Sequence, residues 1–148
     1  MEVRTTRFGT LEIAEDRVIC FSKGLLGFSQ FKRYCLLEPN DDACFFWLQC
    51  VDEPGLAFVV TDPSLFVEEY DAPIRQEQME AMSLASIEDA QVFVIVNKVG
   101  AELTGNLQGP LVINTLNRSG EQLVLADKRW ETRHKLMVVA PDQQRATA

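Results

Sequence analysis

Short apolar runs separated by turn residues dominate the 148-residue chain. Residues 3–8 and 10–14 flank Gly9 and predict two strands that meet at a tight turn. Residues 44–51 and 56–61 predict a second hairpin on the same grounds, and residues 91–98, rich in Val, Phe and Ile, predict a central strand buried on both faces. Further strands are predicted for residues 18–21, 34–37, 66–70, 111–116 and 122–126, with a last strand or short helix within 130–139.

One segment has the pattern of a helix. Residues 75–85 contain no Gly, Pro or β-branched residue, and Ile74, Met79, Met82 and Ala85 could share one face of it. Asp62-Pro63 has the composition of a helix start, with Asp as the N-cap, although the segment after it is short. Residues 30–33 could add one more helical turn.

About nine short strands against one clear helix indicate a mainly β fold class. We expect a single domain over residues 1–140, built as a partly open antiparallel β-barrel or β-roll with one or two short helices. Strands and helices do not alternate regularly, which argues against a doubly wound parallel sheet. Residues 141–148 are expected to form a flexible polar tail.

Composition supports a globular, cytoplasmic protein. A hydrophobic fraction of 47% is too high for intrinsic disorder. The first residues lack an apolar signal region, and the longest apolar runs fall far short of the roughly 20 residues of a membrane span. Cys20, Cys35, Cys44 and Cys50 each lie in an apolar stretch without a CxxC pair, so we interpret them as reduced thiols of the core.

Charge is unevenly distributed along the chain. The net charge is −8, and residues 66–90, which we call the acidic segment, contain seven acids and one base. Residues 128–145 are mildly basic. The net negative charge argues against direct nucleic-acid binding, which requires a basic face. It favours a basic partner, or serves only to keep the protein soluble. Glu68-Glu69-Tyr70-Asp71, followed by the methionine-bearing helix, could bind a basic, partly apolar partner, and composition does not decide between this and an ordinary solvated face.

Catalytic and metal-binding patterns are missing from the sequence. His134 is the single histidine, no GxSxG surrounds a serine, and no phosphate-binding glycine motif is present. We therefore predict no enzymatic activity, no cofactor and no metal site. The alternative is a small-molecule-binding or enzymatic β-barrel whose pocket walls are the glycine-bearing loops 24–28 and 105–110. Residues 104–110 can equally be a turn in which the Asn106 side chain satisfies backbone groups.

Six strings, in order along the chain, resemble the family of the bacterial flagellar assembly factor FliW. In two places the chain departs from the family pattern, since Cys50 stands where serine is usual and Gly109 where alanine is commoner. The matching strings are residues 6–13, 21–28, 46–50, 57–70, 106–114 and 120–125.

The resemblance implies a β-barrel-like domain that binds proteins and works as a monomer when free, in the cytoplasm. Its implied partners are flagellin and the basic RNA-binding repressor CsrA, with no nucleic acid or membrane bound directly. Such a protein antagonises CsrA without covering its RNA site and so relieves repression of flagellin mRNA. The family's CsrA-facing surface suggests Glu69, Asp71 and Glu68 as binding residues. Strand alternation over residues 66–70 would place Glu69 and Asp71 on one face and Glu68 on the other.

Overall fold

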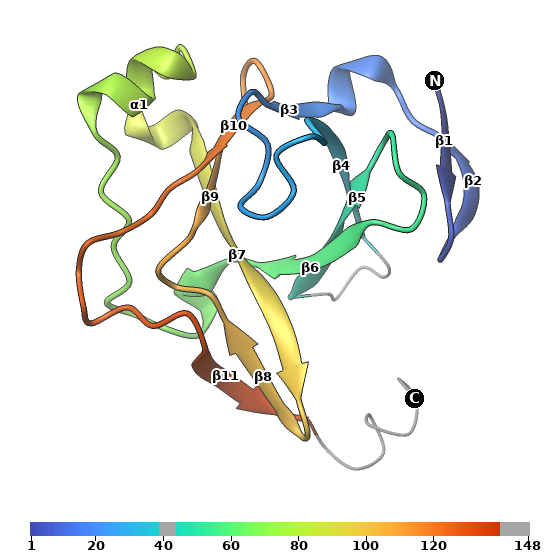
Figure 1. The fold of residues 1–148 in the computed structure, drawn as a ribbon. Coiled ribbons are helices and arrows are strands. Elements are labelled where there is room, and N and C mark those ends of the chain that lie inside the picture. Colours follow the sequence, from blue (N-terminus) through green and yellow to red (C-terminus); the bar gives the residue numbers. More distant parts are fainter. Residues whose placement is uncertain (39–43, 140–148) are drawn as a thin grey trace.

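The structure, a computed structural model, describes residues 1–38 and 44–139, so the predicted tail at 141–148 lies outside the described residues. Strands account for most of the regular structure (Figure 1). The strands are β1 (Glu2–Thr5), β2 (Gly9–Glu12), β3 (Ile19–Phe21), β4 (Arg33–Leu37), β5 (Phe45–Cys50), β6 (Ala57–Thr61), β7 (Ala90–Val99), β8 (Glu102–Gly105), β9 (Leu111–Asn114), β10 (Ser119–Gln122) and β11 (His134–Val138). The helices are α1 (Gln76–Ala81) and the short 3-10 turns η1 (Glu15–Arg17), η2 (Pro63–Leu65) and η3 (Ile87–Asp89).

Seven strands close into a barrel in the order β7-β6-β5-β4-β3-β10-β9, with β9 returning to β7. The mainly β barrel is therefore confirmed, and the barrel is closed where we expected it to be partly open. The ten-residue length of β7 makes closure possible, because its first part pairs with β9 and its later part with β6 and β8. The pairing of β10 with β3 is parallel, while the other barrel pairings are antiparallel.

Two hydrophobic cores lie on opposite faces of the same barrel wall. The core inside the barrel takes side chains from every barrel strand except β10, among them Phe21, Tyr34, Leu48 and Phe93. The second core lies outside β7 and β9, where Val94 and Val112 meet Met82, Leu123 and Trp130. Phe93 and Val94 thus point into different cores, which confirms that β7 is a central strand buried on both faces.

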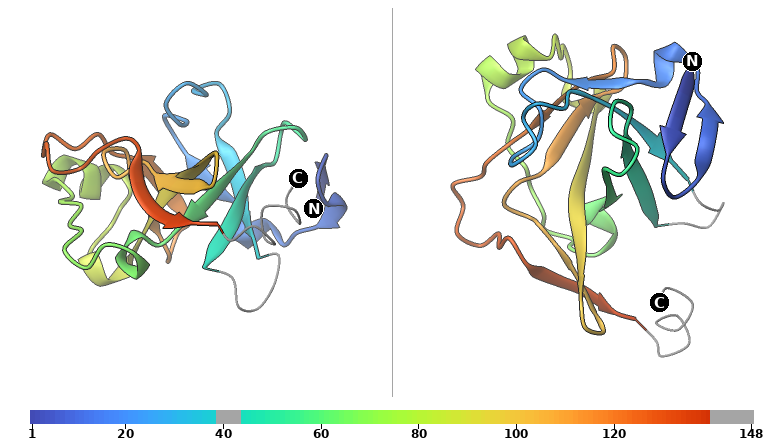
Figure 2. Two further views of the ribbon diagram at one scale, coloured as in Figure 1. Left: turned by 90° about the horizontal axis from the view of Figure 1, so that it is seen from below. Right: turned by 45° about the vertical axis from the view of Figure 1, so that its right-hand side comes forward.

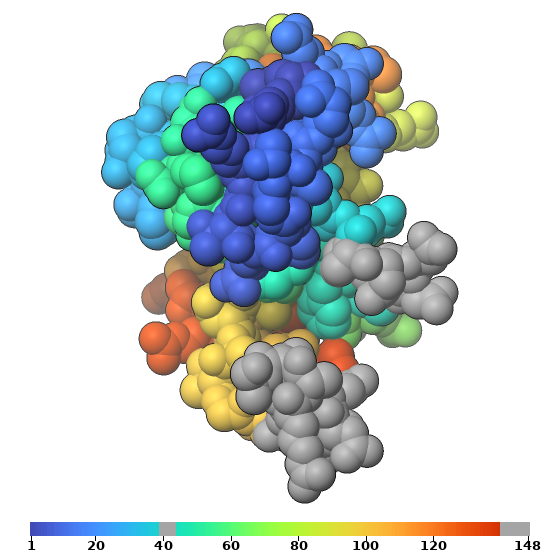
Figure 3. Space-filling model, turned by 90° about the vertical axis from the view of Figure 1, so that its right-hand side faces the viewer, coloured from blue at the N-terminus to red at the C-terminus, as the bar shows by residue number. Residues whose placement is uncertain are grey.

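The β1–β2 hairpin packs against the side of the barrel, and Figure 3 shows it in blue on that face. The Phe8 ring meets the Trp47 ring edge-on with centroids 5.9 Å apart, and the Arg7 guanidinium lies 4.4 Å from the Trp47 centroid. The Thr6 amide donates to the Pro54 carbonyl at 3.0 Å. Both predicted hairpins, this one and β5–β6, are confirmed.

The helix α1 is shorter than predicted and ends near Met82 rather than at residue 85. Ser83 has a φ of +52°, which ends the helix. The side-chain amides of Asn114 and Asn117 then donate hydrogen bonds to the Met82 carbonyl, at 3.0 Å and 2.9 Å. Ala85 is consequently exposed and does not share the buried face with Met82.

Several other local predictions are wrong. Residues 66–70 form turns rather than a strand, residues 30–33 form a turn, a loop and the first residue of β4 rather than a helical turn, and β8 was not predicted. The interpretation of four core thiols holds for Cys35 and Cys50, whereas Cys20 and Cys44 are free but exposed. Cys20 faces outward because it sits between two inward-facing residues of β3.

Candidate partner-binding surface

The first part of the acidic segment runs along the outside of the barrel from η2 to α1 (Figures 1 and 2, green). Asp62 starts η2 as predicted, with its carboxylate accepting from the Ser64 amide at 2.9 Å and Pro63 following it. The chain then turns twice, because the Val67 amide donates to the Pro63 carbonyl and the Tyr70 amide to the Val67 carbonyl. These bonds replace the pairing that a strand would need.

Tyr70 anchors this segment to the second core. Its hydroxyl donates to the Leu107 carbonyl at 2.5 Å, and its ring meets Trp130 edge-on with centroids 4.9 Å apart. Burial raises the pKa of the Tyr70 hydroxyl well above its usual value, and the nearby charge of Asp71 adds to the shift. Tyr70 therefore remains a neutral hydrogen-bond donor, and the acids on either side of it are left facing solvent.

The three predicted binding residues are all exposed, and none forms an ion pair with a residue in the described ranges. Glu69 and Asp71 share a neighbour, Arg129. The pKa of Arg129 is raised chiefly by its hydrogen bonds to Asp127, and further by the charges of Glu69 and Asp71. Glu68 does not contribute to that shift. The structure thus brings Glu69 and Asp71 near one point through a turn, not through strand alternation, which does not exist here.

Asp71 also borders a hollow of about 410 Å³ on this face. A second carboxylate, Asp62, stands on its rim, while most of the wall is apolar. A surface of this kind suits a basic side chain that is followed by an apolar one. The apolar lining residues are Pro63, Ala72, Pro73, Ile74, Ile87, Ala90 and Val92.

The glycine-bearing loops, the alternative site, are held together by Gln122. Its side-chain oxygen accepts from the Leu26 amide at 2.8 Å, and its side-chain nitrogen donates to the Gly109 carbonyl at 2.9 Å. The Asn106 side chain accepts from the Gly109 amide at 3.0 Å, which confirms the turn interpretation of residues 104–110. The Leu26 amide and both backbone groups of Gly109 are therefore already engaged within the protein.

Other chemistry is sparse in the part of the chain that the structure describes. His134 begins β11 opposite Gly105. No group of three or more His, Cys, Asp or Glu side chains is arranged to hold a metal ion among residues 1–38 and 44–139. Within the same ranges, no helix is long and apolar enough to cross a membrane.

The sequence did not reveal the contribution of Arg129, Trp130 and Asp62 to this surface. Asp62 was identified only as a helix cap, although its carboxylate also faces the hollow. Trp130 and Arg129 lie about sixty residues beyond Tyr70, and no local pattern predicts that contact. The mild basic charge of residues 128–145 was the one available signal, and the structure places one of those bases beside Glu69 and Asp71.

Fold and surface together define a small closed β-barrel protein with an acidic, partly apolar face. The family model described as FliW protein matches residues 2–136. The chain is 38% identical to the flagellar assembly factor FliW of Treponema denticola, over 93% of this chain and 94% of that protein. It is 39% identical to the protein of the same description from Alkaliphilus metalliredigens, over 93% and 86% of the two chains.

A solved structure agrees with these relatives. The crystal structure of a flagellar assembly factor FliW superposes with a TM-score of 0.85 at 31% sequence identity, covering 93% of this chain and 97% of that one. The chain therefore belongs to the FliW family.

Proposed function

We propose that this protein is a cytoplasmic, non-enzymatic flagellar assembly factor that binds the translational regulator CsrA through the acidic segment. The observation that supports this proposal most is the position of the exposed Asp71 at a largely apolar hollow, with the exposed Glu69 two residues before it. A basic protein with apolar residues next to its charges would find both kinds of contact there. Family membership and the flagellar role in the relatives' names support the same interpretation.

In this proposal the protein holds CsrA without covering the RNA site of CsrA, and the repression of flagellin mRNA is relieved. Flagellin in the cytoplasm is the second partner. It competes for the free protein, so accumulating flagellin returns CsrA to its mRNA. The net charge of −8 disfavours direct contact with RNA, which is consistent with antagonism through the protein partner alone.

Glu69 and Asp71 rank above Glu68 among the proposed contacts. The turn geometry places the first two near Arg129, so they already face a cation within the free protein. Arg129 is itself engaged by Asp127 at 2.7 Å, and Glu69 and Asp71 therefore keep hydrogen-bonding capacity for a partner.

Replacing Asp71 by lysine should weaken CsrA binding about tenfold, because a cation would then face the basic patch of CsrA. Asp71 is exposed and the structure gives its side chain no hydrogen bond with another described residue, so the fold should be unaffected. Isothermal titration calorimetry at physiological salt measures the change. The matched control is Glu2→Lys on β1, which makes the same charge change on the exposed hairpin away from the acidic segment. Equal affinity of the Asp71 variant and the control would contradict the assignment.

The alternative, a ligand-binding or enzymatic barrel with the glycine-bearing loops as walls, finds less support. Gln122 bridges these loops and uses the backbone groups that a ligand would need. A small molecule that co-purifies with the protein and is displaced by substituting Gln122 would favour this second function.

A further inference from the structure

A second hollow, of about 390 Å³, lies at one end of the barrel. Two of its wall residues, Phe93 and Ile113, belong to the interior core, and Leu36 and Phe46 pack against that core, so the hollow opens onto the barrel interior. It shares Asp62 with the hollow beside Asp71, but Glu68, Glu69 and Asp71 do not line it, and sequence patterns did not point to it.

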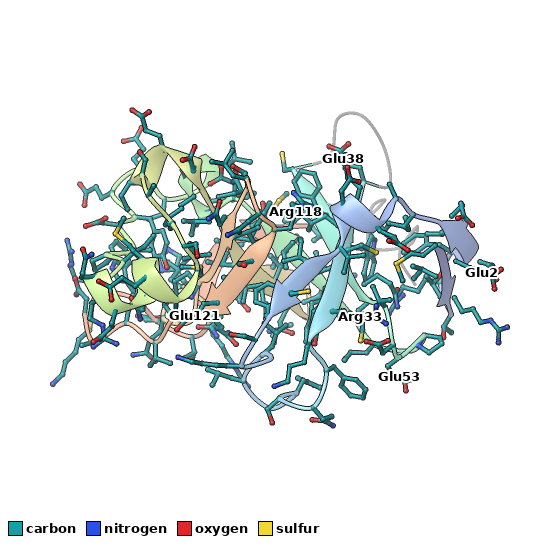
Figure 4. The ribbon with its side chains drawn as sticks, turned by 90° about the horizontal axis from the view of Figure 1, so that it is seen from above. Glu2, Arg33, Glu38, Glu53, Arg118 and Glu121 are labelled. Carbon is teal, nitrogen blue, oxygen red and sulfur yellow. The ribbon has the colours of Figure 1, made fainter. Side chains whose placement is uncertain are left out.

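Arg118 is the cation in this hollow. It directly precedes β10 in a left-handed conformation with a φ of +62°, and its carbonyl accepts from the Cys20 amide at 2.9 Å. Figure 4 labels it where the orange β10 and the blue β3 come together. The segment 117–120 lies between the predicted strands 111–116 and 122–126, so the side chain received no role there.

The Arg118 guanidinium is incompletely satisfied. One terminal nitrogen donates to the Arg17 carbonyl at 3.3 Å, whereas Nε is buried and has no hydrogen-bond partner among the described residues. A guanidinium stays charged in proteins, and a buried donor without an acceptor destabilises the free protein. An incoming acceptor would relieve this destabilisation, and an anionic acceptor would do so best.

The charges around Arg118 also favour an anionic acceptor. Burial lowers the pKa of Arg118, the neighbouring charge of Arg17 lowers it further, and Asp16 opposes both effects. Two arginines thus stand near one acid at this end of the hollow. Asp62 also borders the hollow, but it does not contribute to the Arg118 shift and its carboxylate is engaged by the Ser64 amide and hydroxyl.

The other polar side chains of the wall are already in use. The Thr115 hydroxyl donates to the Asp89 carbonyl at 2.9 Å, and the side-chain Nε2 of Gln91 donates to the Val92 carbonyl at 3.5 Å. Arg118 is thus the wall residue with an unused buried donor. The remaining wall is apolar, so the site combines one cation with a hydrophobic surround.

An exposed leucine in the wall, and a second that follows a wall residue in the chain, favour a protein as the occupant of the hollow. Leu65 belongs to the wall and is 59% exposed, and Leu116, which follows the wall residue Thr115, is 75% exposed. Exposed apolar side chains gathered at a hollow are typical of protein-binding sites. A small ligand buried in the hollow would leave these leucines in water, whereas a polypeptide segment would cover them.

We propose that this hollow binds a partner polypeptide segment in which one acidic side chain, flanked by large apolar residues, reaches the Arg118 guanidinium while the apolar residues cover Leu65 and Leu116. The hollow would prefer an acidic partner, whereas the acidic segment would prefer a basic one. This proposal does not depend on CsrA binding to the acidic segment. Two neighbouring hollows, which share Asp62, would thus bind partner segments of opposite charge.

The test uses a synthetic peptide, acetyl-Ala-Leu-Glu-Leu-Phe-Ala-amide, and the same peptide with glutamine in place of glutamate. NMR of the ¹⁵N-labelled protein follows the Arg118 Nε–H signal during titration. The glutamate peptide should shift this signal and bind at least tenfold more tightly than the glutamine peptide. Equal binding of both peptides, or no change at the Arg118 Nε–H signal, would overturn the proposal.

Two protein variants separate binding from folding. Arg118→Gln should lower affinity for the glutamate peptide about tenfold and abolish the difference between the two peptides. Leu65→Ser should weaken both peptides while Arg118 remains intact. Arg4→Gln, an exposed arginine on β1, is the matched control and should bind like the unaltered protein. Loss of binding in the Arg4 variant, or full binding in the Arg118 variant, would contradict the site.

A third variant tests whether a carboxylate of the same chain accepts a hydrogen bond from the Arg118 Nε–H. Asp41 and Asp42 lie outside the described residues, and the double variant Asp41→Asn, Asp42→Asn removes their charges. Without peptide, the Arg118 Nε–H signal should stay where it is in the unaltered protein. A clear shift would mean that Arg118 is satisfied within the chain, and the proposed partner segment would be excluded.

Discussion

Replacing Gly24 by alanine should lower the free energy of unfolding by about 3 kcal/mol or more, the largest effect of a single methyl group that we expect in this protein. Gly24 has a φ of +66°, where an alanine costs roughly 1–2 kcal/mol. A Cβ at this position would also lie 2.6 Å from the Ser29 Cα and 2.8 Å from the Ser29 carbonyl oxygen. Both are backbone atoms, so the loop itself would have to move.

Movement of this loop would disturb the interior core. Leu25, directly after Gly24, is 1% exposed and belongs to that core, and it forms a β-bridge with Phe28. Gly27→Ala is the matched control, because its φ is +85° but no atom lies within 4 Å of the added Cβ. Gly27→Ala should lower the free energy of unfolding by only about 1 kcal/mol, because only the unfavourable φ of alanine contributes. Urea unfolding measures both variants, and equal losses would contradict the steric explanation.

Gly120→Ala should lower the free energy of unfolding by about 2 kcal/mol for a different reason. Gly120 lies in β10 opposite Phe21 of β3, and an added Cβ would lie 2.5 Å from the Phe21 Cε1. Phe21 is fully buried and packs edge-on against Tyr34 with centroids 5.6 Å apart, so its ring cannot simply swing away.

A double-mutant cycle tests that explanation. Phe21→Leu shortens the side chain that the new methyl group would meet, so Gly120→Ala should cost less in the Phe21→Leu background than in the unaltered protein. Thermal or urea unfolding of the four proteins gives the coupling. An identical cost of the glycine substitution in both backgrounds would show that contact with Phe21 is not the cause.

The parts of the fold that sequence could predict depend on neighbouring residues. The β5–β6 hairpin and the central strand β7 followed from apolar patterning between turn residues. Barrel closure could not be predicted in this way. It depends on the pairing of Ser119 with Cys20 and of Gln91 with Ile113, contacts between residues far apart in the chain.

For the candidate surface, too, the sequence predicted what depends on neighbouring residues and missed what depends on distant ones. Composition located the acidic segment, and the resemblance pointed to Glu69 and Asp71. The predicted strand through residues 66–70 was wrong, because the Tyr70 hydroxyl bonds to Leu107 and its ring packs on Trp130, which holds the backbone in turns. Arg118 lies between two predicted strands and received no role from the sequence, and only the structure shows that its Nε is buried without an acceptor among the described residues.

A competition titration tests the proposed function most directly. The complex of this protein with fluorescently labelled CsrA is formed first, and flagellin is then added while the anisotropy of CsrA is followed. We expect flagellin to release CsrA in proportion to the flagellin bound, and we expect Asp71→Lys to have little CsrA to release. Failure of the unaltered protein to bind CsrA, or a complex that flagellin leaves intact at saturation, would contradict the account.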